Sequence, residues 1–117
     1  MRPLGIHHVS INVTDTAAAL DFYVGVLGLG VRADRPDFSF AGAWLDIGGQ
    51  QVHLLEVPMP DQKGQHFAVW VDDLDATVAE IRAKGVTVSN PKPVGPGRQA
   101  FLNDPSGNLV ELNESPA

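Results

Sequence analysis

The segment His8-Val9-Ser10-Ile11-Asn12-Val13-Thr14-Asp15 has a counterpart half a chain further on, in His66-Phe67-Ala68-Val69-Trp70-Val71-Asp72-Asp73. With the same displacement of 58 residues, and without a gap, Leu54 falls on Leu112 and Asp46 falls on Asp104. Apolar, polar and turn positions therefore stay in phase at both ends of the unit, which is the signature of an internal repeat. The sequence predicts two copies of one module, residues 1–58 and 59–117, within a single domain.

Each module is predicted to contain a strand, a helix and three further strands. Residues 5–13 and 65–71 alternate apolar and polar side chains, as half-buried strands do. The later strands are expected near 30–34, 40–47 and 51–57 in the first module, and near 86–89, 98–103 and 108–113 in the second. The Pro- and Gly-rich segment 89–97 is expected to be a loop and a candidate lid. The predicted fold class is α+β, with two βαβββ modules whose mixed sheets curl around a cleft.

The helices have recognisable caps and apolar stripes. Thr14 or Asp15 is predicted to cap the first helix, and Asp72 or Asp73 the second. Gly85 is expected to end the second helix. The residues expected to face the core are Leu20, Tyr23, Val26 and Leu27 in the first helix and Leu74, Val78 and Ile81 in the second.

Composition narrows the class of function. The 117 residues contain 8 basic and 14 acidic side chains, for a net charge of −6, and no cysteine. A negative chain is repelled by phosphate backbones and anionic lipids, so nucleic-acid and membrane-surface roles are not expected. The absence of cysteine excludes disulfides, thiolate ligands and cysteine nucleophiles. No signal-peptide pattern is visible at the N-terminus, and we expect a cytoplasmic protein.

Polar side chains on four predicted strands share one parity. Because side chains alternate faces along a strand, burying the apolar set under the helices sends His8, His53, His66 and Glu111 to the opposite face. Imidazole and carboxylate are ligands for Zn, Ni, Co, Mn or Fe. A half-buried histidine satisfied by its neighbours is the alternative for each residue alone. For the whole set the sequence favours a divalent metal site, which contains a 2-His-1-carboxylate triad in His8, His66 and Glu111.

Several other residues are candidates to line the cleft. Trp70 and Phe101, with Phe38 and Phe40, are candidates to form an apolar wall, although core packing is favoured for each residue alone. Arg98 is a candidate to bind a substrate anion, although a solvated or structural role is favoured. The orientation of Trp44 stays open at this point.

The opening Ile6-His7-His8-Val9, the central His66-Phe67-Ala68-Val69 and the stretch Asn103-Asp104-Pro105-Ser106-Gly107-Asn108-Leu109-Val110-Glu111-Leu112 resemble the vicinal oxygen chelate superfamily. That group includes glyoxalase I, epimerases, extradiol dioxygenases and bleomycin resistance proteins. The resemblance covers nearly the whole chain and implies paired βαβββ modules around a metal-binding cleft. The family's ligand positions fall on His8, His53, His66 and Glu111.

The resemblance implies a divalent-metal-dependent lyase or isomerase that acts on a small molecule with vicinal oxygens, with Glu111 moving the proton. Asn12 stands where glyoxalase I-like proteins often carry an arginine for the glutathione carboxylate, and we expect it to contact substrate. Extradiol-type ring cleavage and non-catalytic binding of an antibiotic are the alternatives. The resemblance also implies a homodimer, with each metal site lying within one chain or shared between two.

Overall fold

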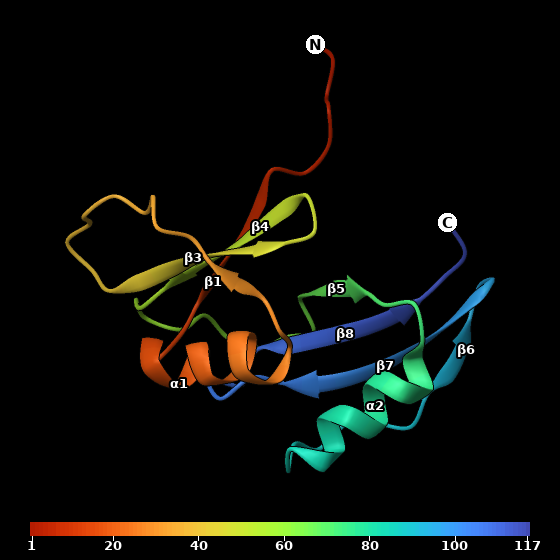
Figure 1. Cartoon of the computed structure of the whole chain (residues 1–117). Helices are drawn as coiled ribbons and strands as arrows, with labels where there is room; N and C mark the ends of the chain where they lie inside the picture. Colours follow the sequence, from red (N-terminus) through yellow and green to blue (C-terminus); the bar gives the residue numbers. More distant parts are fainter. The chain divides into compact units, whose positions relative to one another are not determined.

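The computed structural model describes residues 1–117, which form two units, Met1–Asp61 and Gln62–Ala117. The first unit contains β1 (His8–Asn12), α1 (Thr16–Leu20), the π-helix η1 (Asp21–Val26), β2 (Gly30–Val31), β3 (Gly42–Ile47) and β4 (Gln50–Leu55). The second contains β5 (His66–Trp70), α2 (Leu74–Ala83), β6 (Lys92–Val94), β7 (Gly97–Asn103) and β8 (Leu109–Glu114) (Figure 1). The predicted α+β fold of two repeated βαβββ modules is confirmed.

The two sheets have the same topology. Their strand orders are β1-β4-β3-β2 and β5-β8-β7-β6, and in each sheet the first and last strands of the module pair in parallel. His8 lies opposite Gln51 in the first sheet, and His66 lies opposite Leu109 in the second. The displacement of 58 residues found in the sequence is therefore kept in the pairing of these strands.

The third strands of the two modules, β3 and β7, are related by a displacement that is one residue shorter. Asp46 lies opposite Gln51, whereas the residue opposite Leu109 is Asn103. The structural counterpart of Asp46 is thus Asn103, and the alignment with Asp104 was wrong. The connection in the second module is one residue longer, and the buried Asp104 carboxylate closes it by accepting bonds from the Ser106 and Asn108 backbone N–H groups at 2.8 and 2.9 Å.

The predicted cap, end and buried face of helix α2 are confirmed. The Asp73 side chain caps it by accepting a 3.0 Å bond from the Ala76 N–H, and Gly85 follows its end with a φ of 83°. Leu74, Val78 and Ile81 are buried, and the helix packs against β7 and β8. None of the helices has both the length and the apolar character needed to cross a membrane.

The first helical segment differs from its pattern. Asp15 caps α1 as predicted, but after Leu20 the chain widens into η1. The buried residues are Ala19, Phe22 and Tyr23, and of the four expected core positions only Tyr23 is fully buried. A π-helix bonds i to i+5, so its wider turns rotate the inward face away from a stripe drawn at 3.6 residues per turn.

The strand expected near 86–89 was also wrong. Val88 is buried without belonging to a ladder, and β6 instead forms inside the segment expected to be a loop. There Gly95, with a φ of 49°, lets the chain turn back so that β6 pairs with β7. Pro93 lacks an N–H, but β6 is the edge of its sheet, where a missing donor is tolerated.

Candidate functional site

In the first module, His8 and His53 form a stacked pair. The register places Ser10 opposite His53, so His8 is the diagonal neighbour of His53 on the same face of the sheet. Their ring centroids are 4.0 Å apart, with 13° between the planes. Trp44 lies directly opposite His53 on β3 and stacks on its other side at 4.3 Å. His53 is consequently only 6% exposed although it lies on the face expected to bind ligands.

The His53 ring is oriented by a neighbour on its own strand. Its Nε2 donates to Gln51 Oε1 at 2.8 Å, which leaves Nδ1 with the lone pair in the neutral ring. Burial lowers the pKa of His53, and the neighbouring His8 and His7 lower it further. Both effects favour the neutral imidazole that a metal ion requires.

In the second module, His66 and Glu111 occupy the corresponding diagonal positions on β5 and β8. His66 Nε2 lies 3.0 Å from Glu111 Oε1, while His66 Nδ1 donates to the Gly64 carbonyl at 2.8 Å. Asn113 Nδ2 donates to the second carboxylate oxygen of Glu111 at 2.9 Å. The bonds to the Gly64 carbonyl and then to Glu111 raise the pKa of His66. Both functional groups are thus oriented by neighbours of their own module.

The His66–Glu111 pair has the character of half a metal site. Because Nδ1 carries the proton given to Gly64, the lone pair of a neutral His66 ring points from Nε2 at a carboxylate oxygen. Two acceptors that face each other need a proton or a cation between them. A metal-binding histidine commonly donates its other ring N–H to a carbonyl or carboxylate in this way. The donor set therefore fits a divalent metal ion, although no three His, Asp or Glu side chains gather in one group.

Residues that orient the pairs were missed by the sequence analysis. Gln51 and Asn113 each lie two positions from the residue they hold, on the same strand and the same face. The shared strand parity of Gln51 with His53 and of Asn113 with Glu111 is visible in the sequence. Phe101 and Trp44 are structural counterparts opposite Glu111 and His53, and Phe101 meets the His66 ring edge-to-face at 5.4 Å.

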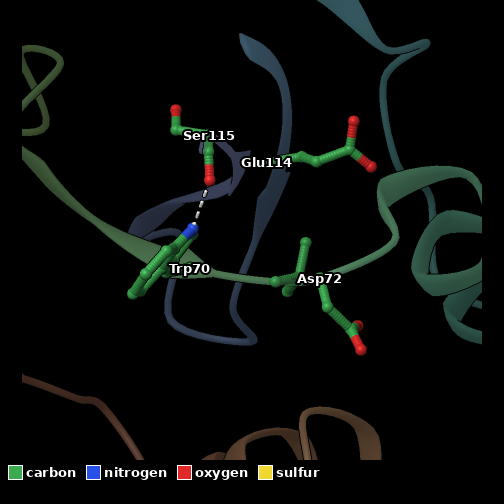
Figure 2. A pocket seen from close by; sticks show the side chains of 5 residues that line it. Trp70, Asp72, Glu114 and Ser115 are labelled. Carbon is green, nitrogen blue, oxygen red and sulfur yellow. Dashed lines mark hydrogen bonds between the residues drawn. The ribbon is translucent and has the colours of Figure 1, made fainter. Parts of the chain in front are cut away.

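Trp70 lines a cavity of about 400 Å³ at the ends of β5 and β8 (Figure 2). Its indole N–H donates to the Ser115 carbonyl at 2.8 Å, and the residue is 65% exposed. The other lining residues are Val71, Asp72, Glu114 and Ser115, and the His66–Glu111 pair is not among them. A substrate contact by Trp70 stays a prediction.

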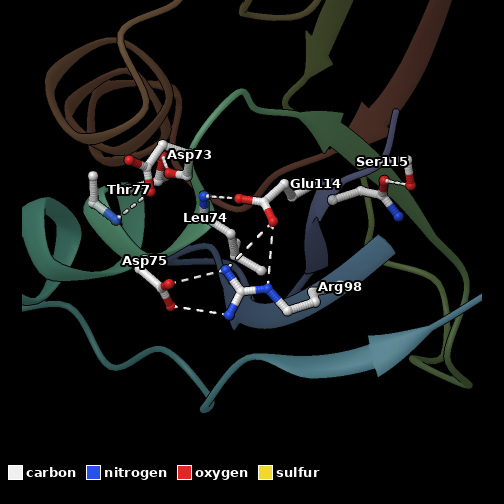
Figure 3. A network of polar contacts seen from close by, with 9 residues as sticks. Asp73, Leu74, Asp75, Thr77, Arg98, Glu114 and Ser115 are labelled. Carbon is white, nitrogen blue, oxygen red and sulfur yellow. Dashed lines mark hydrogen bonds and ion pairs between the residues drawn. The ribbon is translucent and has the colours of Figure 1, made fainter. Parts of the chain in front are cut away.

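Arg98 is engaged by two carboxylates (Figure 3). Its guanidinium binds both oxygens of Asp75, at 3.2 and 3.0 Å, and lies 3.3 Å from Glu114 Oε1. Glu114 Oε2 accepts a 2.8 Å bond from the Leu74 N–H, so the network ties the first turn of α2 to β7 and β8. Binding of a substrate anion by Arg98 stays a prediction and would compete with these contacts.

Asn12, at the end of β1, also has a partner within its module. Its side-chain Nδ2 donates to the Pro58 carbonyl at 2.8 Å. This bond links the end of β1 to the segment that follows β4 and fixes the direction of the amide. A substrate contact by Asn12 stays a prediction.

Comparisons with known proteins place this geometry in a family. The chain is 32% identical to the uncharacterised protein YaeR of Escherichia coli (strain K12), with 93% of this chain and 95% of that protein aligned. It is 31% identical to a probable lactoylglutathione lyase of Vibrio cholerae, covering 92% and 88% of the two chains. Among solved structures, TnmS3, an antibiotic binding protein from Streptomyces sp. CB03234, superposes with a TM-score of 0.82 at 31% identity and 99% coverage of both chains.

The model of the Glyoxalase/Bleomycin resistance protein/Dioxygenase superfamily matches residues 5–112. That span contains both polar pairs and every strand up to the middle of β8. The chain therefore belongs to the Glyoxalase/Bleomycin resistance protein/Dioxygenase superfamily.

Proposed function

We propose that this protein is a divalent-metal-dependent lyase or isomerase of the glyoxalase type, acting on a small molecule with two neighbouring oxygens. The observation that carries the proposal is the His66–Glu111 pair, in which the imidazole Nε2 and an oxygen of a buried carboxylate lie 3.0 Å apart. We propose that His8 and His53 of a first module complete the ligand set, from the same chain or from a second copy. The similarity to a probable lactoylglutathione lyase supports the reaction class.

The residues of this chain suit proton transfer between adjacent carbons. When bound, a divalent cation supplies the Lewis acidity that stabilises negative charge on neighbouring substrate oxygens. Glu111 is the proposed base, since its carboxylate can release one contact and carry a proton. Asn113 holds the second oxygen of Glu111, so the carboxylate keeps its direction while Oε1 acts. The carbonyl of Gly64 keeps the proton of His66 on Nδ1 and Nε2 available as a ligand.

A second candidate function is non-catalytic binding of a drug-like molecule. The 31% identity to the antibiotic binding protein TnmS3 over 99% of both chains favours it. So does the continuous run of rings from His8 through His53 to Trp44, with Phe38 tilted against Trp44 at 6.3 Å. The two functions differ in whether bonds in the ligand change.

Exchange of substrate hydrogen with deuterium oxide tests the choice between them. Zinc-, nickel- and cobalt-loaded protein would be incubated with a panel of α-hydroxycarbonyl compounds, including glutathione hemithioacetals, and exchange at the hydroxyl-bearing carbon followed by NMR. We expect exchange on at least one member, and a loss of about a hundredfold or more in Glu111→Gln. Glu80→Gln makes the same change on the exposed side of α2 and should retain the rate.

No exchange on any member of the panel would contradict the enzyme and favour the binding protein. Exchange that persists unchanged in Glu111→Gln would contradict the role proposed for that carboxylate.

A further inference from the structure

The loop between β2 and β3 carries an arginine without a carboxylate partner. Arg32 binds Asp34 and Asp46, and Arg98 binds Asp75 and Glu114. Arg35, in contrast, forms no ion pair, and its Nη2 donates a hydrogen bond to the Phe40 carbonyl at 2.8 Å. A guanidinium has five N–H donors, so most of the donors of Arg35 are available to a ligand.

Arg35 is held in place by aromatic rings. Its guanidinium carbon lies 5.0 Å from the centroid of the Phe38 ring and 5.7 Å from that of Phe40, within the range of cation–π attraction. Nη2 also passes close to Gly42, where an added Cβ would stand 3.2 Å away. The charge is thus positioned before any ligand arrives, which reduces the entropy lost on binding.

The two phenylalanines form a stacked apolar pair beside this charge. Their rings stack at 5.2 Å with 8° between the planes, and Phe38 is 44% exposed. Phe38 also contacts Trp44, which stacks on His53. A continuous series of rings therefore runs from the exposed loop to a proposed metal ligand.

We propose that Arg35, Phe38 and Phe40 form a binding site for a planar aromatic molecule that carries a carboxylate. The ring of the ligand extends the aromatic stack, and its carboxylate accepts bonds from the unused N–H groups of Arg35. Asp34 does not compete for Arg35, because Arg32 holds it, and Asp37 forms no ion pair with Arg35. The inference rests on the proposed function, which it deepens by naming aromatic acids as the class of small molecule that the site takes.

Calorimetric binding of three matched probes tests this inference on the full chain. The probes are 2-naphthoate, its uncharged analogue 2-naphthamide, and the saturated, non-planar decahydro-2-naphthoate. We expect 2-naphthoate to bind about tenfold or more tightly than either analogue, as a charge-assisted contact and a stacked ring both contribute. Arg35→Gln should remove the advantage over the amide, and Phe38→Leu the advantage over the saturated acid. Arg2→Gln removes the same charge from the exposed terminus and should change nothing.

Equal binding of acid and amide by the unmodified chain, no binding of the acid at millimolar concentration, or unchanged binding in Arg35→Gln would overturn the inference. The metal content of the same samples, measured separately, distinguishes this failure from failure of the proposed function. If the protein binds metal but not naphthoate, only the proposed aromatic site is contradicted. If the protein takes up no metal ion but still binds naphthoate in a way that depends on Arg35, the proposed enzymatic function is contradicted and the aromatic site is supported.

Discussion

Glu56 and Glu114 make the same contact in the two modules. Each follows or ends the last strand of its module and accepts a 2.8 Å hydrogen bond from the first backbone N–H of the helix, that of Thr16 or of Leu74. A carboxylate at a helix N-terminus satisfies an otherwise unpaired donor and is favoured by the helix dipole. Only the second module adds an arginine, Arg98, which links its glutamate to Asp75.

This arrangement predicts an acid-dependent loss of stability. The Arg98 guanidinium holds the pKa of Asp75 below its usual value of 3.8. A depressed carboxyl pKa contributes stability that is fully present above the unfolded-state pKa and is lost as pH falls through the folded-state pKa. The free energy of unfolding should therefore drop below about pH 4 by more in the unmodified protein than in Asp75→Asn.

Urea titrations between pH 7 and pH 3 measure this difference, and Asp37→Asn is the control because Asp37 is exposed and makes no ion pair. Parallel pH profiles for the unmodified chain and Asp75→Asn would contradict the prediction.

Asn113 is predicted to act on metal affinity through Glu111. Asn113→Leu removes the donor that fixes Glu111 Oε2, and loss of such an outer contact typically weakens metal binding about 10- to 100-fold. Competition with a chromogenic chelator measures the change. Ser115→Ala removes only the other side-chain contact of Asn113 and should leave the affinity within about twofold. Equal effects of the two variants would assign Asn113 a purely structural role.

Gln51 should have a similar but separable effect on the first module. Gln51→Leu frees the His53 ring to turn and removes the contact that keeps the proton on Nε2. We expect metal affinity to fall about tenfold. Gln50→Leu, the same change at the exposed neighbouring position, should not alter it. An unchanged affinity in Gln51→Leu would mean that stacking between His8 and Trp44 alone orients His53.

Glycine is required at position 42 because β3 and β4 approach each other closely there. A Cβ at this position would lie 2.1 Å from the Leu54 carbonyl oxygen, so Gly42→Ala must displace backbone. Overpacking of this kind costs about 1–3 kcal/mol. Gly49→Ala is the matched control, since nothing lies within 4 Å of a Cβ there. Chemical denaturation should show the loss in the first variant only, and equal midpoints for both would refute the close approach.

Alternation along strands predicted the polar pairs because successive side chains of β5 alternate between exposed and half-buried. His66, Ala68 and Trp70 are exposed while Phe67 and Val69 are half-buried, so parity alone indicates the direction of His66. Parity does not measure displacement along a strand. The diagonal relation of His66 to Glu111 depends on the register between β5 and β8, which tertiary pairing sets.

The predictions from the sequence were wrong where the local residue pattern disagrees with the strand pairing of the fold. Val86 and Val88 are good strand formers, yet the ladder at this edge is completed by a hairpin containing Pro93, which propensity disfavours. The widening of the first helix into η1 likewise has no cue in the spacing of Leu20, Tyr23 and Val26. At the edge of the second sheet, pairing of β6 with β7 outweighs the local preference.

The metal content of the untagged protein tests the central claim most directly. The chain would be purified, incubated with zinc, nickel, cobalt, manganese or iron(II), desalted, and analysed by elemental mass spectrometry alongside His66→Ala, Glu111→Gln and Glu80→Gln. The account predicts close to one ion per chain in the unmodified protein and in Glu80→Gln, and loss of most of it in the other two variants. No bound ion after any incubation, or an ion that both variants retain, would contradict a site built on His66 and Glu111.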